Sequence, residues 1–364
     1  EVDLLIMDCS LSPIQHRNLE RFFDKKIIDR TQLIIEIFGL RAATKEGKLQ
    51  VELANLSFER TRLVRSWTHL ERQRGGLSKV GGPGESQIEL DKRMINTKIK
   101  QLKKLLSKVR QTREIQRKPR KNDNNLIFSL VGYTNSGKST IFNNLTSSKV
   151  LVKDMVFATL DTKMSLVNLS NNKKIILSDT VGFISALPTE LIDSFNSSLE
   201  ELFSSDYLLL VHDLSNPNIE NEAKLVFETL KKIGFTEEVL KNKVINIFNK
   251  SDINSNVDNI DIKFKNKFVK TCALTKDGTK NLINYLEKLV DKNFSDILFF
   301  IPTDSLKISS WLHKNSFIYN DIYCDGNFTG NKVKSKISTQ KLEHFKLNFP
   351  HIKINSIKET NHDQ

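Results

Sequence analysis

The chain of 364 residues is too long for one ordinary core and predicts two or three domains. Its most apolar run, ILFFIP, is far too short to cross a membrane, so we expect no stable membrane insertion. The net charge of +13 is concentrated in residues 1–125, which hold 27 Lys and Arg against 16 Asp and Glu, whereas the rest of the chain holds 29 against 27. A positive field of this kind favours polyanionic partners.

The three cysteines, Cys9, Cys272 and Cys324, share no spacing typical of metal ligands. An odd number leaves one thiol unpaired in any disulfide scheme. A reducing compartment suits such thiols best, and we therefore expect a cytoplasmic protein.

Residues 1–43 are predicted to form a small α/β subdomain. The stretch VDLLIMDCSLSPIQHRNLERFF passes from an apolar strand through a turn at Pro13 into a helix. The apolar run TQLIIEIFGL, residues 31–40, is a second strand candidate.

Residues 44–118 are predicted to form an antiparallel helical hairpin that completes an N-terminal domain of residues 1–122. Two apolar patterns at heptad spacing flank the glycine-rich segment RGGLSKVGGPGES, residues 74–86, which we expect to be a helix-free tip. The seam residues are Leu49, Leu53, Leu56, Leu63, Trp67 and Leu70 in the first helix and Ile88, Ile95, Ile99, Leu102, Leu106 and Val109 in the second.

The polar stretch RKPRKNDNN, residues 117–125, contains Pro119 and predicts a linker. Strands then alternate with helical patterns over residues 123–294, which predicts a doubly wound α/β domain. Residues 295–364 suggest a strand, a helix, a hairpin of strands and a last helix near TQKLEHFKL, and so a small α+β domain.

Residues 132–139, GYTNSGKS, fit the pattern G-x-x-x-x-G-K-S between a strand and a helix. Backbone N–H groups of such a loop surround phosphate oxygens, and the helix N-terminus adds partial positive charge. Lys138 would supply a cation to the β- and γ-phosphates, and Ser139 would offer its hydroxyl to Mg²⁺. The expected nucleotide contacts here are Gly132, Tyr133, Thr134, Asn135, Ser136, Gly137, Lys138 and Ser139.

The motif Asp179-Thr180-Val181-Gly182 ends a later strand, where Asp179 can hold Mg²⁺ through water and the Gly182 N–H can meet a γ-phosphate. In MVFATLDTK, either Thr159 or Thr162 can close over Mg²⁺ when the triphosphate is bound. Phe183 follows this motif at a position where many nucleotide hydrolases with such a loop carry a glutamine that orients the attacking water. Because phenylalanine cannot hydrogen-bond water, we expect slow intrinsic hydrolysis.

Two further motifs indicate that the base is guanine. In Asn249-Lys250-Ser251-Asp252, the Asp252 carboxylate can accept hydrogen bonds from two guanine donors that adenine lacks, while Lys250 packs over the base. Cys272-Ala273-Leu274 ends another strand and offers a backbone N–H to guanine O6. The order and positions of all four motifs predict GTP with Mg²⁺.

The motifs GYTNSGKST, VFATLD, DTVGFI and NKSD closely resemble those of the HflX family of GTPases, and so do WTHLERQRGGL and GGPGESQIELDKRMI in the N-terminal third. The resemblance covers essentially residues 1–295. It implies a Ras-like P-loop G domain after a domain that ends in a helical hairpin, and action on the large ribosomal subunit to split stalled or idle ribosomes.

The resemblance also implies that the switch I threonine is Thr159, which would join Ser139 at Mg²⁺. With Lys138 and Gly182, Thr159 would form the catalytic set. The nucleotide contacts implied in this segment are Phe157, Ala158, Thr159, Leu160 and Asp161.

Residues 98–121 hold eleven Lys and Arg and a single acid, Glu114. A solvated helix face usually mixes both signs, so this surplus favours a hairpin that faces nucleic acid. We therefore expect a monomeric GTPase that binds the large ribosomal subunit and its rRNA. Two alternatives stay open: an NTPase that remodels free RNA or serves RNA modification, and a signalling GTPase with a protein partner.

Overall fold

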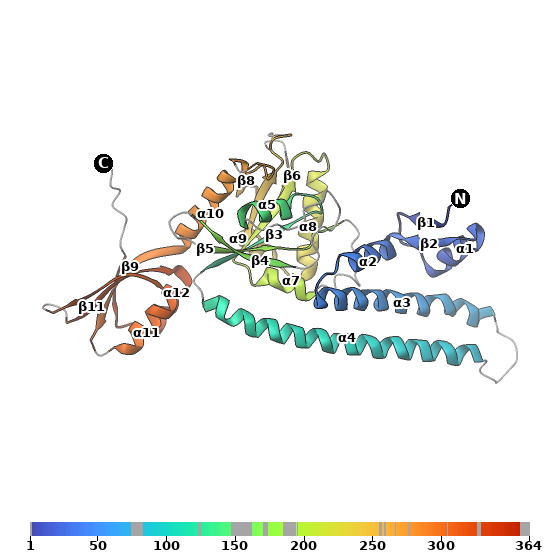
Figure 1. Ribbon diagram of the computed structural model, residues 1–364, viewed down its shortest axis with the longest axis horizontal. Coiled ribbons are helices and arrows are strands. Elements are labelled where there is room, and N and C mark those ends of the chain that lie inside the picture. The colour runs from blue at the N-terminus through green and yellow to red at the C-terminus, as the bar shows by residue number, and fades with distance from the viewer. Residues whose placement is uncertain are drawn as a thin grey trace.

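Figure 1 shows an elongated molecule in which a central α/β unit lies between an N-terminal unit with two long helices and a C-terminal sheet unit. In the described part of the chain, no helix is both long enough and apolar enough to cross a membrane. The three cysteines are free thiols. The computed structural model describes residues 2–73, 83–122, 125–146, 162–169, 174–184, 194, 196–254, 257, 260–265, 267–275, 277–303, 305–325 and 329–356.

The N-terminal unit begins with two parallel strands, β1 (Leu4–Met7) and β2 (Lys26–Asp29), which are joined by helix α1 (Pro13–Phe23). Ser12 caps this helix. Its Oγ accepts the Gln15 N–H at 3.3 Å, and its own N–H donates to Gln15 Oε1 at 2.9 Å. This reciprocal pair satisfies two backbone N–H groups at the helix start, and it confirms the predicted strand, turn and helix.

Residues 31–40 form part of helix α2 (Arg30–Arg41), so the strand prediction for this stretch is wrong. Asp29 caps the helix, because its Oδ1 accepts the Gln32 N–H at 2.8 Å. A short apolar run does not by itself distinguish a buried strand from a buried helix. The cap satisfies a backbone N–H at the helix start, and the packing of Ile34, Ile35 and Phe38 in one apolar cluster decides in favour of helix.

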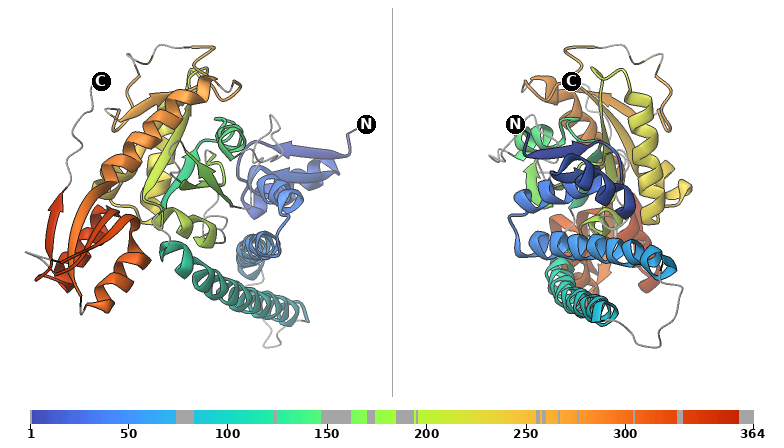
Figure 2. Two further views of the ribbon diagram at one scale, coloured as in Figure 1. Left: turned by 60° about the vertical axis from the view of Figure 1, so that its left-hand side comes forward. Right: turned by 90° about the vertical axis from the view of Figure 1, so that its right-hand side faces the viewer.

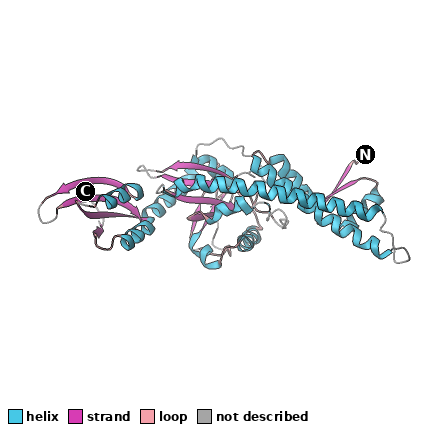
Figure 3. Cartoon of the chain, turned by 90° about the horizontal axis from the view of Figure 1, so that it is seen from below, coloured by secondary structure: helices cyan, strands magenta, loops and turns pink. Residues whose placement is uncertain are grey.

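Helices α3 (Lys45–Gln73) and α4 (Pro83–Asn122) lie side by side and form the predicted hairpin (Figure 2, Figure 3). The seam is confirmed for the members of one apolar cluster, which does not include Leu63 and Val109. Its buried members are Leu53, Ile99, Leu102 and Leu106, with Leu49, Leu56 and Ile95 packed against them. The side chains of Trp67, Leu70 and Ile88 and the tip at residues 74–82 lie outside the described residues.

Helix α4 is longer at both ends than the sequence predicts. It begins at Pro83, inside the expected helix-free tip, because proline suits the first position of a helix, where its missing N–H is not needed. It continues past Pro119 to Asn122, where a linker is predicted. Proline removes one backbone hydrogen bond there, but a loss so near the end of a long helix does not stop it.

The central unit is a six-stranded sheet in the order β4-β5-β3-β6-β7-β8, parallel except for β4 against β5. Apolar clusters cover both faces, which confirms the doubly wound α/β prediction. The strands are β3 (Leu126–Gly132), β4 (Lys163–Asn168), β5 (Lys174–Asp179), β6 (Tyr207–Asp213), β7 (Val244–Asn249) and β8 (Phe268–Lys270). The helices are α5 (Lys138–Thr146), α7 (Asn196–Phe203), α8 (Ile219–Ile233), α9 (Glu237–Lys243), the short η1 (Asp277–Thr279) and α10 (Lys280–Asn293).

The C-terminal unit is an antiparallel sheet in the order β10-β11-β9-β12 with two helices. Its final strand was not predicted, because the stretch HIKIN offers only two apolar residues. The elements are β9 (Phe294–Pro302), α11 (Leu306–Asn315), β10 (Phe317–Cys324), β11 (Gly330–Ser338), α12 (Thr339–Asn348) and β12 (Lys353–Ser356).

An apolar cluster, which we name the junction cluster, joins the N-terminal and central units. Val181, within the DTVG motif, is only 9% exposed and packs against side chains of α2 and α3. The motif is therefore in contact with the base of the hairpin. The members of the cluster are Ile34, Ile35, Phe38, Ala42, Val51, Ala54, Phe58 and Val181, with Ile37 and Ile184 packed against them.

Candidate nucleotide site

The loop between β3 and α5 holds the predicted phosphate-binding residues 132–139. It begins where β3 ends and closes where α5 begins, so its N–H groups and the helix N-terminus meet at the carboxyl edge of the parallel sheet. Ser136 Oγ is buried and has no hydrogen-bond partner among the described residues. A phosphate oxygen would satisfy it, because buried hydroxyls are normally hydrogen-bonded.

Lys138 is buried in this loop, and its Nζ donates to the Tyr133 carbonyl oxygen at 2.6 Å. Burial lowers the pKa of Lys138 from 10.5 to about 8, although Asp179 and Glu222 oppose the shift through their charges. A buried ammonium that is incompletely compensated favours an added anion. The geometry therefore suits a nucleotide phosphate.

Ser139 and Asp179 supply oxygen atoms of the kind that Mg²⁺ prefers. Ser139 Oγ donates to Asp179 Oδ2 at 2.7 Å, and Asp179 is fully buried at the end of β5. A hydroxyl and a carboxylate are hard ligands, and Mg²⁺ usually takes few protein oxygens and keeps substrate phosphates and water for the rest. These residues fit the ion.

The segment that follows β5 is bonded to the phosphate-binding loop. The Thr134 N–H donates to the Phe183 carbonyl at 2.8 Å, and the Phe183 N–H donates to the Gly132 carbonyl at 3.1 Å. A Cβ at Gly182 would stand 3.0 Å from Thr134 Cγ2 and 3.1 Å from Lys138 Nζ. The bare backbone of Gly182 therefore leaves the space beside the Lys138 ammonium for a ligand.

Phe183 is buried, with 5% of its surface exposed, in the apolar cluster beneath the sheet. Its ring packs in that cluster with Val131, Leu199 and Leu202. It therefore cannot reach a water at the γ-phosphate, in agreement with the expectation from its residue type.

Asn249 connects the guanine-side loop to the phosphate-side loop. Its Nδ2 donates to the Ser136 carbonyl at 2.9 Å, and its Oδ1 accepts the Ala273 N–H at 3.0 Å. Gly137 makes room for it: this residue has φ +95°, and a Cβ would stand 2.1 Å from Asn249 Nδ2. One amide thus fixes the distance between the predicted phosphate and base subsites.

Lys250 adopts a left-handed backbone conformation, φ 60°, and its Nζ contacts Asp213 Oδ2 at 2.6 Å. This ion pair holds the lysine stem across the predicted base site. Asp252 and Leu274 are exposed, whereas Cys272 and Ala273 are buried. Asp252 and Leu274 therefore lie at the open edge of the site, where a base can enter.

The structure brings together the predicted residues of the three described motifs and the loop at 272–274. Val181 is the exception in orientation, because its side chain packs in the junction cluster and only its backbone borders the site. The predicted contacts Phe157, Ala158, Thr159, Leu160 and Asp161 lie outside the described residues.

Sequence reasoning overlooked two supporting residues. Asp213 ends β6 and holds Lys250, and Asn144 on α5 donates to the Ala273 carbonyl. The position of Asp213 at the carboxyl end of a parallel strand was an available signal, because ligands of such sheets bind at that edge. Asn144 lies inside a helix and gave no signal.

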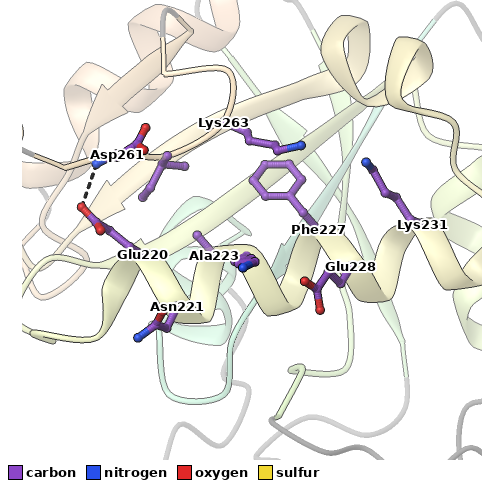
Figure 4. A pocket seen from close by; sticks show the side chains of 10 residues that line it. Glu220, Asn221, Ala223, Phe227, Glu228, Lys231, Asp261 and Lys263 are labelled. Carbon is purple, nitrogen blue, oxygen red and sulfur yellow. Dashed lines mark hydrogen bonds between the residues drawn. The ribbon is translucent and has the colours of Figure 1, made fainter.

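A separate hollow of about 410 Å³ lies between α8 and residues 261–263 (Figure 4). Its walls mix both signs of charge, and the Asp261 N–H donates to Glu220 Oε1 at 2.8 Å across one end. It contains none of the predicted site residues. We assign it no ligand, because its charges alternate and no buried polar group converges on one point.

Three sequence-family models match the chain. Their descriptions are "GTP-binding GTPase N-terminal" for residues 1–39, "GTP-binding GTPase Middle Region" for residues 41–120 and "50S ribosome-binding GTPase" for residues 127–250. Together they cover the N-terminal unit and most of the central unit.

Curated relatives and a solved structure are similar over much of the chain. A "GTPase HflX" of Magnetococcus marinus is 50% identical over 69% of this chain, which spans 57% of that protein. A "GTPase HflX" of Caldanaerobacter subterraneus is 34% identical over 95% of this chain and 78% of its own length. A GTP-binding protein of Sulfolobus solfataricus, solved with GDP, is 27% identical over 80% of this chain and 82% of its own, with a TM-score of 0.47.

Proposed function

The chain belongs to the HflX GTPase family, and from this premise we propose that it hydrolyses GTP and acts on the large ribosomal subunit. The observation that carries the proposal is the bridge made by Asn249, which binds the loops at Ser136 and Ala273 at once. That bridge sets a phosphate subsite and a base subsite at a fixed spacing, as a guanine nucleotide needs.

Each loop contributes a distinct part of recognition. The Asp252 carboxylate accepts the guanine N1–H and N2 amine, and Lys250, held by Asp213, covers one face of the base. Lys138 neutralises the phosphates, and the Gly182 N–H donates to the γ-phosphate. Bound Mg²⁺, held by Ser139, Asp179 through water, and Thr159, would neutralise charge that develops on the phosphate oxygens.

Hydrolysis requires an oriented water, and Phe183 supplies no group for it. We therefore propose that the free protein turns over slowly and that contact with the ribosome completes the site. Completion of GTPase sites by a partner raises turnover by about 10³- to 10⁵-fold in well-studied cases. We expect at least tenfold from large subunits.

The hairpin provides the contact with rRNA in this proposal. The described part of α4 carries five exposed lysines: Lys98, Lys100, Lys103, Lys104 and Lys108. Such a shaft matches the phosphate backbone of RNA, and the glycine-rich tip would approach the subunit most closely. The family-model description "50S ribosome-binding GTPase" supports this partner.

We propose that the chain works as a monomer of three domains, residues 1–122, 123–294 and 295–364, in the cytoplasm where ribosomes are found. GTP would favour the bound state that splits stalled or idle ribosomes, and hydrolysis would release the protein. This cycle distinguishes it from an NTPase of free RNA and from a signalling GTPase, because neither would respond to ribosomal subunits.

Co-sedimentation with large subunits tests the proposal. The wild type should pellet with subunits in the presence of a non-hydrolysable GTP analogue and less with GDP, and subunits should raise its GTP turnover. Splitting of whole ribosomes is then followed by light scattering. The proposal would be contradicted if pelleting were the same with every nucleotide and if large subunits left GTP turnover unchanged.

A charge-reversed shaft provides the matched comparison. Lys100→Glu with Lys103→Glu on α4 should weaken pelleting. The slope of log affinity against log salt concentration should become shallower by about 2, because each lost phosphate contact removes close to one unit of slope. Lys224→Glu with Lys232→Glu makes the same charge change on exposed positions of α8. That control should pellet like the wild type.

A further inference from the structure

The C-terminal unit lies beyond residue 250, where the last matched family model ends, and contributes none of the nucleotide-site residues named above. Its elements follow the order strand, helix, strand, strand, helix, strand. Ile308 and Leu312 of α11 and Phe345 of α12 pack in one cluster with inward residues of the strands. Both helices therefore cover the same face of the sheet (Figure 1), and no described helix of this unit covers the other.

Strand pairing defines the composition of that second face. Phe300 on the central strand β9 pairs with Lys332 on β11 and with Lys353 on β12, and Leu298 pairs with Lys334. Directly paired residues in a sheet point to the same face. The second face therefore carries an aromatic ring with lysines on both sides.

The ring of Phe300 lies between two ammonium groups. Lys332 Nζ is 5.9 Å and Lys353 Nζ is 5.7 Å from the ring centroid. Lys334 and Lys353 are exposed, and Phe300 is partly exposed. Cations at this distance are attracted by the ring and stand within reach of a ligand that stacks on it.

Among the described paired residues of this face, the acidic residue, Asp296, lies at the end opposite to Phe300. Asp296 pairs with Lys336 on the adjoining strands, and Lys336 Nζ also contacts Asp291 Oδ1 at 3.3 Å. The lysine at that end is thus balanced. The end around Phe300 has Lys332, Lys334 and Lys353, and the pairing there places no acidic residue beside them.

We propose that this surface, which we name the C-terminal basic face and define by Phe300, Lys332, Lys334 and Lys353, binds single-stranded RNA. A partly exposed ring in the middle of a four-stranded sheet can stack a base on its accessible side, and lysines beside it can hold the flanking phosphates. A duplex could use the lysines but not the ring, because its bases are already stacked. The basic surroundings disfavour a cationic protein partner.

Amide groups complete the face. Asn320 pairs with Lys334, and Asn355 pairs with Leu298, so both lie on the same side of the sheet as Phe300. Both are exposed and can hydrogen-bond base edges. This activity goes beyond the proposed GTP hydrolysis, since it involves no residue of the nucleotide site and requires neither GTP nor a ribosome.

Fluorescence anisotropy with a labelled oligouridylate of about ten nucleotides tests the proposal on the full chain without nucleotide. Phe300→Leu removes the ring, keeps an apolar side chain and should weaken binding roughly tenfold. Lys332→Glu with Lys353→Glu should weaken RNA binding further. The slope of log affinity against log salt concentration should become shallower by about 1.4. Lys307→Glu with Lys314→Glu is the control, because it makes the same charge change at exposed positions of α11 on the covered side.

The basic hairpin also attracts RNA, so the site of contact must be mapped. Photo-crosslinking of a 4-thiouridine oligonucleotide followed by trypsin should label residues 293–307, which lie between Lys292 and Lys307 and contain Phe300. Crosslinks confined to α4, equal weakening by the control pair, or stronger binding of an acidic peptide than of RNA would overturn the proposal. If Phe300→Leu has a lower melting temperature than the wild type, the Lys332→Glu/Lys353→Glu variant and the crosslink map test the proposal instead.

Discussion

The nucleotide site and the hairpin are held together in different ways. In the site, buried polar atoms meet at fixed distances: Asn249 bonds to two loops, and Ser139 bonds to Asp179. In the hairpin, α3 and α4 share a seam of apolar side chains, and lysines are exposed over residues 98–108 of α4.

The difference teaches where single substitutions matter. A buried hydrogen bond leaves a desolvated partner behind when one member is lost, which costs about 1–3 kcal/mol or more for a charged group. An exposed lysine row distributes its effect over many weak terms of about 1 kcal/mol or less. One substitution can therefore disable the nucleotide site, whereas each lysine substitution in the hairpin should lower its affinity for RNA only slightly.

The largest expected effect is the loss of turnover in Lys138→Ala. The buried ammonium lies within the phosphate-binding loop, and its removal should lower GTP hydrolysis about 10³-fold or more, with or without ribosomes. Phosphate release measures it. Lys163→Ala, an exposed position on β4, should retain wild-type turnover. Turnover of Lys138→Ala above a tenth of the wild-type rate would show that hydrolysis does not depend on the Lys138 ammonium.

A second, somewhat smaller effect is expected at the base. Asp252→Asn should weaken GTP binding by about 2–4 kcal/mol and improve binding of xanthosine triphosphate, because the amide can donate to the xanthine O2. Calorimetric titration with both nucleotides measures the exchange. Asp261→Asn, at an exposed position, serves as the control. Unchanged preference in Asp252→Asn would place the base elsewhere.

His212 extends the comparison to stability. It is buried, its Nε2 donates to Asn246 Oδ1 at 2.9 Å, and burial lowers its pKa from 6.5 to about 4. Between these values the unfolded chain binds a proton that the folded chain does not. Neutral His212 therefore contributes about 3 kcal/mol to the free energy of unfolding above pH 6.5, and this contribution is lost as the pH falls through 4.

Urea unfolding at several pH values measures this slope. His212→Gln should flatten the pH dependence between 4 and 6.5, whereas His313→Gln, at an exposed position of α11, should leave it as in the wild type. Identical slopes for both variants would assign the acid sensitivity to other groups.

The smallest effect is expected where the two regions meet. Val181→Ala removes two methyl groups from the junction cluster and should destabilise the contact of the motif with α2 by about 1–2 kcal/mol. Amide exchange in α2 should rise, while GTP affinity changes little because the side chain points away from the nucleotide. If Val181→Ala lowered GTP affinity as much as Asp252→Asn does, nucleotide binding would be coupled to packing at the base of the hairpin.

The same contrast explains what the sequence could predict. The site motifs are short and depend on residue identity, so the positions of Gly132–Ser139 and Asn249–Asp252 at strand ends could be predicted from the sequence alone. The hairpin could be predicted from apolar periodicity. Its boundaries could not, because Pro83 begins α4 inside a glycine-rich segment and α4 continues past Pro119, where proline usually ends a helix.

Two features could not be predicted because they depend on tertiary contact. Helix α2 has an apolar run that fits a strand equally well, and only its packing against α3 and Val181 distinguishes the two. The role of Asp213 depends on its distance from Lys250, residues 37 positions apart in the chain. Spacing along the sequence carries no information about such a pair.

The burial of Lys138 makes the proton a second ligand of the nucleotide site. With a pKa of about 8 in the free protein, the ammonium has partly lost its proton in mildly alkaline solution. Phosphates held against it would raise that pKa, so binding should take up a proton, and affinity should fall by up to about tenfold for each pH unit above 8. Calorimetry in buffers of different ionisation enthalpy would detect this proton uptake directly.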